Sequence, residues 1–297
     1  MRLDEPDPVL NQLQQDLLSW WDRAGRHDLP WRLTRDPWAV LVSELMLHQT
    51  RAARVVPAHT SFLARFPTPA ACAAASVGEV VGAWAGLGYN RRAVSLHRSA
   101  LALVDRHGGV LPEDLDRLLD LPGVGPYTAR AVLVFAFGHD IGLVDTNAGR
   151  FLARALAGHA LSRPEAQRVA DSSVPQGMGW SWGQAVFDLG ALVCTRRAPA
   201  CERCPVQASC AWFGAGRPAP DPVVGSAGIS GGQSRFDGSF RQGRGRLVDR
   251  LRDGPVAAEE VARAAGWPCD AARAWRAAES LIADGLARRD GDGLRLS

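Results

Sequence analysis

The chain has 297 residues, of which 46% are hydrophobic, and it carries a net charge of +3. This length and apolar content allow a substantial core and favour two domains over one. We expect neither a signal peptide at the acidic start nor a membrane span, since no apolar run is long enough. All 34 basic residues are arginine, which excludes imine catalysis by a lysine side chain.

Apolar residues recur at helical spacing through most of the first 213 residues. The first predicted helix covers 8–24 and carries Leu17 and Trp21 on one stripe. A second helix opens with Asp36 as its N-cap and Pro37 at its first position. Further helices are predicted at about 52–65, 77–85, 91–106, 113–120, 126–137, 147–157, 164–171 and 182–193. Strand-like alternation is almost absent before residue 240, so this part is predicted to be all-α.

The end of the chain has a different pattern. A stretch rich in Gly, Pro and Ser covers 214–239 and is predicted to be a linker. Three short helical patterns follow at 246–252, 256–264 and 270–284, and a turn at 290–293 then separates two short apolar-polar runs. Three helices and a terminal hairpin predict a small winged-helix-like α+β domain over 240–297.

Four cysteines lie close together at the spacing C-x6-C-x2-C-x5-C: Cys194, Cys201, Cys204 and Cys210. Four thiols in so short a run indicate a metal site or a disulfide knot, and the expected absence of a secretion signal argues against the knot. A zinc site usually pairs two close-spaced sets of ligands, whereas only Cys201 and Cys204 are close here. The spacing therefore favours an iron–sulfur cluster and leaves zinc as the alternative.

The sequence Leu-Pro-Gly-Val-Gly at 121–125 joins two predicted helices. Gly123 and Gly125 let the backbone bend sharply, and Pro126 suits the first position of the second helix. The N-terminus of that helix would direct N–H groups and a positive dipole end at a DNA phosphate. An ordinary helix–helix turn is the alternative.

Three segments together resemble the helix-hairpin-helix superfamily that includes endonuclease III. Residues 121–129 resemble its hairpin, 144–147 resemble the aspartate segment that follows it, and 194–210 resemble its iron–sulfur loop. The segments at 29–32, 43–50 and 86–89 are similar to MutY-type adenine DNA glycosylases, and the resemblance covers about 8–213. Bifunctional relatives carry a catalytic lysine where this chain has Tyr127. The resemblance therefore implies a monofunctional glycosylase.

The family's fold would be a helix-hairpin-helix glycosylase domain over 1–213. A helical barrel is expected at about 33–142, and a cluster subdomain is expected from the N-terminal segment with about 143–213. The resemblance implies a [4Fe-4S] cluster on the four cysteines and hydrolysis of the N-glycosidic bond of adenine mispaired with 8-oxoguanine or guanine. The expected partner is double-stranded DNA with a mispaired or damaged base. We expect a monomer in the bacterial cytoplasm, associated with the nucleoid.

Two carboxylates are the candidates for the chemistry. The helical neighbours of Glu44 are mostly apolar, so its carboxyl is expected to be desolvated and to keep a proton near neutrality. A solvent-facing Glu44 is the alternative. Depurination needs an acid for the leaving base and a carboxylate for the oxocarbenium-like sugar, as in glycoside hydrolysis. The resemblance assigns these roles to Glu44 and Asp145, and Asp145 also fits a helix N-cap.

The resemblance implies roles for the other site residues too. Tyr127 and Asn147 would line the sugar and water side of the pocket. The adenine side would be formed by Trp31, Arg32, His48 and Asp188. DNA contacts are expected from Gln49, Leu87, Tyr89, Gly123, Val124, Gly125, Arg196 and Arg197, with Gln49 and Tyr89 wedged beside the extruded nucleotide. For Trp31, core packing is an equal alternative.

Two departures from the family leave the specificity open. His48 replaces the first glutamine of the usual pair, and could hydrogen-bond to Glu44 or titrate near pH 6.5. The family's Nudix-like C-terminal domain, which reads 8-oxoguanine, is not recognisable, and 240–297 stands in its place. Its arginines, Arg241, Arg244, Arg246, Arg250 and Arg252, either contact DNA or form a solvated face. The alternatives to adenine excision are a uracil or thymine mismatch glycosylase and a non-enzymatic iron–sulfur DNA-binding protein.

Overall fold

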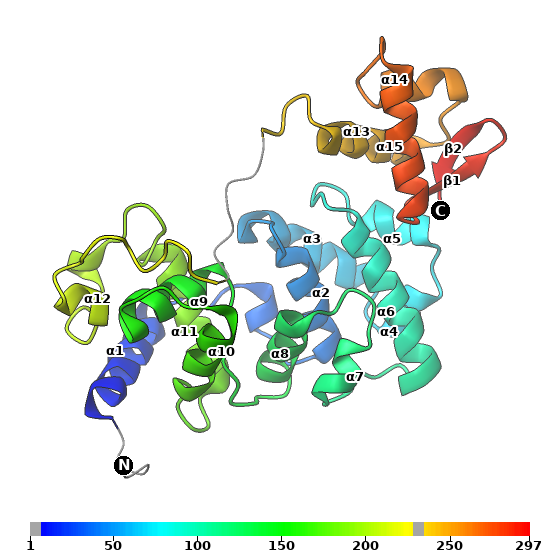
Figure 1. Ribbon diagram of the computed structural model, residues 1–297. Helices are drawn as coiled ribbons and strands as arrows, with labels where there is room; N and C mark the ends of the chain where they lie inside the picture. The colour runs from blue at the N-terminus through cyan, green and yellow to red at the C-terminus, as the bar shows by residue number, and fades with distance from the viewer. Residues whose placement is uncertain (1–6, 228–234) are drawn as a thin grey trace. The chain divides into compact units, whose positions relative to one another are not determined.

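The computed structural model describes residues 7–227 and 235–297 (Figure 1). The chain divides into two compact units, each assembled from two stretches of sequence. Unit 1 contains Met1–Arg35 and Pro126–Gly231, and unit 2 contains Asp36–Gly125 and Gly232–Ser297. The N-terminal helix therefore belongs with the cysteine region, and the C-terminal module belongs with the central helices. No described helix is long and apolar enough to cross a membrane.

Unit 1 is helical. It contains α1 (Pro8–Ala24), a 3-10 turn η1 (Pro30–Arg32), α8 (Pro126–Phe135), α9 (Thr146–Phe151), a π-helical stretch η2 (Leu152–Ala157), α10 (Arg163–Ser172), α11 (Gly179–Leu192), η3 (Cys201–Arg203) and α12 (Ala211–Gly214). The predicted stripe of α1 is confirmed, since Leu17 and Trp21 enter a core that also holds Phe151, Trp182 and Leu189. Helix α11 packs against α1 and α9, which makes it the central helix of the unit.

Part of the segment predicted as a linker packs against unit 1. Asp221 accepts a hydrogen bond from Arg154 Nε at 3.0 Å, and the Ala227 N–H donates to the Leu161 carbonyl at 2.8 Å. Val223 is buried. The rest of the predicted linker includes 228–234, which lie outside the described residues.

Unit 2 begins with a second set of helices. They are α2 (Pro37–Leu47), α3 (Ala52–Arg65), α4 (Pro69–Ala73), α5 (Val77–Ala83), α6 (Arg91–His107) and α7 (Leu115–Leu119). Asp36 caps α2 as predicted, accepting from the Trp38 and Ala39 N–H groups. Every residue of α2 from Trp38 to Met46 is buried, so this helix runs through the core and has no solvent-facing side.

The C-terminal module of unit 2 matches the predicted three helices and hairpin. It consists of α13 (Phe240–Asp253), η4 (Ala258–Glu260), α14 (Val261–Ala264), α15 (Ala271–Ala283), β1 (Ala287–Asp290) and β2 (Gly293–Leu296). The strands are antiparallel, with Ala287 opposite Leu296 and Asp290 opposite Gly293. A side chain at position 293 would come within 2.4 Å of the Val256 carbonyl oxygen, so the close approach of this segment requires glycine.

Candidate active site and cysteine cluster

Asp145 caps helix α9, and its carboxylate is fully engaged by that helix. Oδ1 accepts hydrogen bonds from the Asn147 and Ala148 N–H groups at 2.8 and 2.7 Å, and Oδ2 accepts one from Asn147 Nδ2 at 2.9 Å. Burial raises the pKa of the Asp145 carboxyl, while these hydrogen bonds and the charge of Arg150 oppose the rise. The N-cap role is therefore confirmed, and the same geometry fixes the direction in which the carboxylate points.

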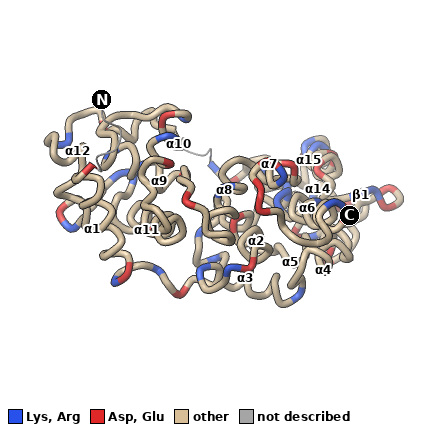
Figure 2. Tube along the Cα trace, turned by 90° about the horizontal axis from the view of Figure 1, so that it is seen from below, with Lys and Arg blue, Asp and Glu red and all other residues tan. Residues whose placement is uncertain are grey.

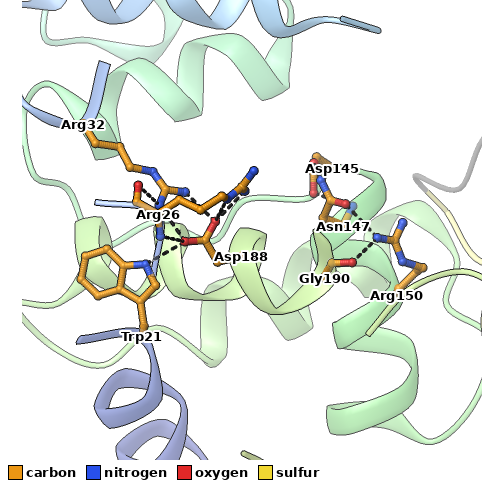
Figure 3. A network of polar contacts seen from close by, with 8 residues as sticks. All are labelled: Trp21, Arg26, Arg32, Asp145, Asn147, Arg150, Asp188 and Gly190. Carbon is orange, nitrogen blue, oxygen red and sulfur yellow. Dashed lines mark hydrogen bonds and ion pairs between the residues drawn. The ribbon is translucent and has the colours of Figure 1, made fainter. Parts of the chain in front are cut away.

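Arg150 joins Asn147, which bonds this carboxylate, to Gly190 of α11, as Figure 3 shows. Its guanidinium donates to Asn147 Oδ1 at 2.8 Å, to the Gly190 carbonyl at 2.5 Å and to the Thr146 carbonyl at 2.6 Å. Its Nε also donates to the Cys194 carbonyl at 2.9 Å. One buried side chain thus ties α9, α11 and the start of the cysteine loop together.

Gly190 allows the close contact between α9 and α11. A Cβ at this position would come within 2.6 Å of the backbone oxygen of Asn147 and 2.7 Å of its Cβ. Such distances are not found for real Cβ atoms, so any side chain at 190 would push α9, and with it Asn147, away from α11.

Asp188 lies two residues earlier on α11 and forms a second network, drawn beside the first in Figure 3. Arg32 donates two hydrogen bonds to the Asp188 carboxylate, at 2.7 and 2.9 Å, and both side chains are almost completely buried. Arg26 Nε donates at 2.7 Å, and Trp21 Nε1 donates at 3.2 Å. Burial raises the pKa of Asp188, but the hydrogen bonds and charges of Arg32 and Arg26 outweigh burial and leave it below its usual range.

The structure thus brings together two of the residues predicted at the adenine, Arg32 and Asp188. Trp31 is 7% exposed, which agrees with core packing. Within the described part of the chain, the buried Nε of Arg32 has no hydrogen-bond partner. Tyr127, in the first turn of α8, contacts Phe187 of α11 with ring centroids 6.4 Å apart.

Glu44 lies in unit 2, near the C-terminal end of α2. Its residue exposure is 4%, as expected for a desolvated carboxyl. Helix α2 ends at Leu47, and His48 is its C-cap residue, with φ −55° and ψ 109°. Burial and the nearby charge of Arg92 both lower the pKa of His48. His48 is therefore neutral at pH 7, and the expected titration near pH 6.5 moves to a lower pH.

Arg92, which the sequence did not single out, holds two loops of unit 2 together. Its Nη1 donates to the carbonyls of Leu45, Met46 and His48 at 2.6–2.8 Å, at the end of α2. Its Nη2 donates to the carbonyl of Gly88 at 2.9 Å, in the turn between α5 and α6. Burial lowers the pKa of Arg92 to about 10, so it keeps its charge at neutral pH.

The two predicted wedge residues extend from these loops. Gln49 and Tyr89 have φ values of +57° and +47°, in the left-handed region that costs a residue with a Cβ about 1–2 kcal/mol. Gln49 is exposed and Tyr89 is 41% exposed. Strained, outward-facing positions of this kind cluster at ligand-binding sites. Leu87, in the same turn as Tyr89, is 4% exposed, so its side chain packs inside unit 2.

The predicted hairpin at 121–125 rests on helix α6. Gly123 has φ +82°, and a side chain there would come within 2.5 Å of Ser95 Cβ. Ser99 Oγ donates to the Pro122 carbonyl at 2.6 Å. Gly123 is exposed, whereas Val124 is buried and can offer only its backbone to a ligand.

All four cysteines of the predicted cluster line one cavity of unit 1, which is partly open to solvent. All four are free thiols in the structure. The walls are mostly apolar, and burial raises the pKa of the Cys204 thiol to about 12. Arg154 lies beside them, with Nη1 3.4 Å from Cys194 Sγ. Buried thiols facing one cavity beside a cation would gain most from binding a metal group, which stabilises their thiolate form.

The spacing of the thiols bears on the kind of metal group. A zinc ion holds its sulfur ligands at about 2.3 Å from the metal. Among the described His, Cys, Asp and Glu residues, no three are placed to hold a single metal ion. The four thiols that line this cavity are the residues that would hold a metal group.

Arg196 and Arg197 lie in the first cysteine loop, and both are exposed. The loop is held by Arg154, which donates to the carbonyls of Thr195 and Arg196 at 2.7 and 3.1 Å. The buried arginine thus shapes the backbone, while the two exposed arginines remain accessible to a phosphate. This arrangement agrees with the predicted DNA contact.

The arginines at the start of the C-terminal module are mostly engaged within unit 2. Arg244 pairs with Asp284, and Arg250 lies 4.0 Å from Glu260. Arg252 reaches the carbonyl of Val81 in helix α5. Figure 2 shows acidic and basic residues interspersed in this module. Arg244, Arg250 and Arg252 therefore serve contacts within unit 2, a role that the sequence alone did not predict.

Comparison with known proteins gives concordant matches. Residues 42–176 match the model of the HhH-GPD superfamily of base excision DNA repair proteins. The adenine DNA glycosylase of Mycolicibacterium smegmatis is 41% identical over 282 residues, covering 94% of this chain and 93% of that protein. The thymine-DNA glycosylase of Aeropyrum pernix is 35% identical and covers 69% of this chain and 95% of that protein.

Among solved structures, a thermostable thymine-DNA glycosylase superposes with a TM-score of 0.64 at 28% identity, covering 70% of this chain and 97% of that one. The mycobacterial match is broader. Because it covers 94% of the chain, it extends into the C-terminal module, beyond the region that the sequence motifs marked.

Proposed function

Because this chain belongs to the adenine DNA glycosylase family of the HhH-GPD superfamily, we propose that it removes adenine mispaired with 8-oxoguanine or guanine in double-stranded DNA. The reaction is hydrolysis of the N-glycosidic bond, the first step of base excision repair. Similarity to an adenine DNA glycosylase over almost the whole length carries this proposal. With no lysine in the chain, the product is an intact abasic site.

Two carboxyl groups perform the chemistry. Glu44, buried in α2, protonates the leaving adenine, because a desolvated carboxyl favours its neutral form. Asp145 stays ionised and stabilises the oxocarbenium-like sugar. Its three hydrogen bonds support this role, since donors to a carboxylate favour the charged form. Asn147 and Tyr127 line the sugar side, where water attacks.

The base side is formed by Arg32, Asp188, Trp31 and His48. The unpartnered buried Nε of Arg32 supports this assignment, because a base nitrogen or oxygen would satisfy it. His48 acts as a neutral hydrogen-bonding group, given the lowered pKa of its ring. Asp188 orients Arg32 and is itself held by Arg26 and Trp21.

Four cysteines, Cys194, Cys201, Cys204 and Cys210, hold a [4Fe-4S] cluster. When bound, the cluster cross-links the loop through its thiolates. Arg150 and Arg154 stabilise the negative charge of that site, and Arg154 holds the loop backbone so that Arg196 and Arg197 reach a phosphate. Further DNA contacts come from the backbone of the Gly123–Gly125 hairpin and from Gln49 and Tyr89. We expect a monomer acting on the bacterial chromosome, in the cytoplasm.

Substitution of the two carboxyls tests the mechanism. Glu44→Gln removes the acid but no phosphate contact, so base release should be abolished while duplex binding stays near the wild-type value. Asp145→Asn should also reduce base release severely. Base release would be followed by alkaline cleavage of a labelled A:8-oxoG duplex, and binding by a mobility-shift assay. Activity retained in either variant would contradict the assignment.

A second candidate function is excision of thymine or uracil from mismatches. The match to a thymine-DNA glycosylase over 95% of its length supports it. The same cleavage assay on T:G and U:G duplexes distinguishes the two functions, since only the base removed differs.

A further inference from the structure

The turn that carries Tyr89 is strained and must be held by its surroundings. It joins α5 to α6, and Gly86, Gly88 and Tyr89 all have positive φ, at +79°, +68° and +47°. For tyrosine this conformation costs about 1–2 kcal/mol, and the ring is also partly exposed. A turn of this kind keeps one conformation only when neighbouring groups determine it.

Arg92 supports the turn from the side of α2. The C-terminal module supports it from another side, through Arg252 of α13. The Arg252 guanidinium donates to the Val81 carbonyl at 3.1 and 3.2 Å and to Asn90 Oδ1 at 3.0 Å. Val81 lies in the last turn of α5, and Asn90 is the N-cap of α6. One partly buried guanidinium therefore spans the two ends of the turn.

Other contacts seat the module on the same two helices. The Ser297 carbonyl accepts from the Gly78 N–H at 2.5 Å, at the start of α5. A Cβ at position 78 would come within 2.8 Å of that oxygen, so this contact needs glycine. At the start of α6, Arg91 Nε lies 3.2 Å from Asp284 Oδ1, and Asp284 is fixed in turn by Arg244. The module thus contacts α5 and α6 on both sides of the turn.

We propose that the C-terminal module braces the Gly86–Tyr89 turn, with Arg252 as the positioning residue that holds Tyr89 ready to enter the DNA duplex. The role of Tyr89 in this inference depends on the proposed glycosylase function, whereas the brace itself does not. The brace gives the module a part in base extrusion without any direct contact to DNA.

Hydrogen exchange of the free, full-length protein tests the brace. Arg252→Ala should raise amide exchange in residues 84–91 several-fold, because the bonds to Val81 and Asn90 are lost. Arg246→Ala is the matched control, since it removes the same charge from an exposed position on the same helix. Asn90→Ala leaves the module intact and removes only the acceptor, and should act like Arg252→Ala. Exchange equal to wild type in both Arg252→Ala and Asn90→Ala would overturn the proposal.

Single-turnover kinetics test the positioning role. Arg252→Ala should slow adenine release from an A:8-oxoG duplex about 10- to 100-fold, the range for a displaced positioning group. The salt dependence of duplex binding should be unchanged, whereas loss of a direct phosphate contact would reduce its slope by about 1. In a Tyr89→Ala background the further effect of Arg252→Ala should vanish, and a full effect there would overturn the inference. If the wild-type protein releases no base while the variants show the expected hydrogen-exchange pattern, the proposed function is refuted and the brace is still supported.

Discussion

Replacing Arg32 by methionine tests how far the buried Asp188 network determines the stability of unit 1. The variant removes two hydrogen bonds, of 2.7 and 2.9 Å, from a carboxylate whose side chain has no solvent exposure. Removing one partner of a buried ion pair costs roughly 3–5 kcal/mol, because the other charge remains buried. Arg26 and Trp21 still bind Asp188, so we expect the lower end, about 3 kcal/mol.

Thermal unfolding followed by circular dichroism measures this loss. Domains of about 150–250 residues shift by about 2–4 °C per kcal/mol, so the midpoint should fall by about 6–12 °C. Arg23→Met is the matched control, because Arg23 is exposed and donates to the Ser19 carbonyl, one turn earlier in α1, at 3.1 Å. Its midpoint should stay within about 2 °C of the wild type. Equal midpoints for Arg32→Met and Arg23→Met would refute the reasoning.

The stability lost in Arg32→Met should also depend on pH, in a direction set by the pKa of Asp188. Burial raises the pKa of Asp188, but Arg32 and Arg26 together lower it further, and the net pKa lies below the usual range. A carboxyl with a depressed folded pKa stabilises the protein above its unfolded pKa of about 3.9, and this stabilisation is lost as pH falls through the folded value. In Arg32→Met the pKa of Asp188 rises, so this variant should lose stability at a higher pH than wild type. Curves of unfolding midpoint against pH that run parallel for wild type and Arg32→Met would contradict this account.

Three further predictions concern the active-site helices and the cysteines. Gly190→Ala should destabilise the protein by more than about 3 kcal/mol in urea unfolding, because its Cβ would meet the Asn147 backbone. The control Gly82→Ala has open space around it and should be neutral or stabilising. Similar urea midpoints for the two variants would contradict this prediction. Adenine release should decline as pH falls towards the pKa of Asp145. Because burial raises that pKa, the acid limb of the pH–rate profile should lie above the ordinary value of 3.8. An acid limb at or below 3.8 would contradict the role of Asp145. Purified protein should be brown, with iron and sulfide each near about four per chain; colourless protein containing one zinc would exclude the cluster.

Local sequence signals predicted most of the helices. Asp36 with Pro37 marked the start of α2, and the stripe through Leu17 and Trp21 marked the buried face of α1. The short helix α4, Pro69–Ala73, was not predicted. The continuation from α9 into a π-helical stretch at Leu152–Ala157 was also missed, since nothing in that apolar run distinguishes the two hydrogen-bond patterns.

Contacts between distant segments could not be predicted in the same way. Glu44 and Asp145 were identified from their motifs, but Arg92 and Arg252 bind backbone carbonyls, which leave no trace in the residue types around them. The grouping of α13 with α5 and α6 depends on long-range packing. The burial of Leu87 and the position of His48 at the end of α2 also depend on the folded chain.

Base release from a panel of labelled duplexes tests the central claim most directly. The duplexes would carry A:8-oxoG, A:G, A:C, T:G and U:G, and strand cleavage would be scored with and without alkali. The account predicts release of adenine from A:8-oxoG and A:G, cleavage only after alkali, and no adduct trapped by borohydride, because the chain has no lysine. Release of thymine or uracil with no release of adenine would contradict the assignment.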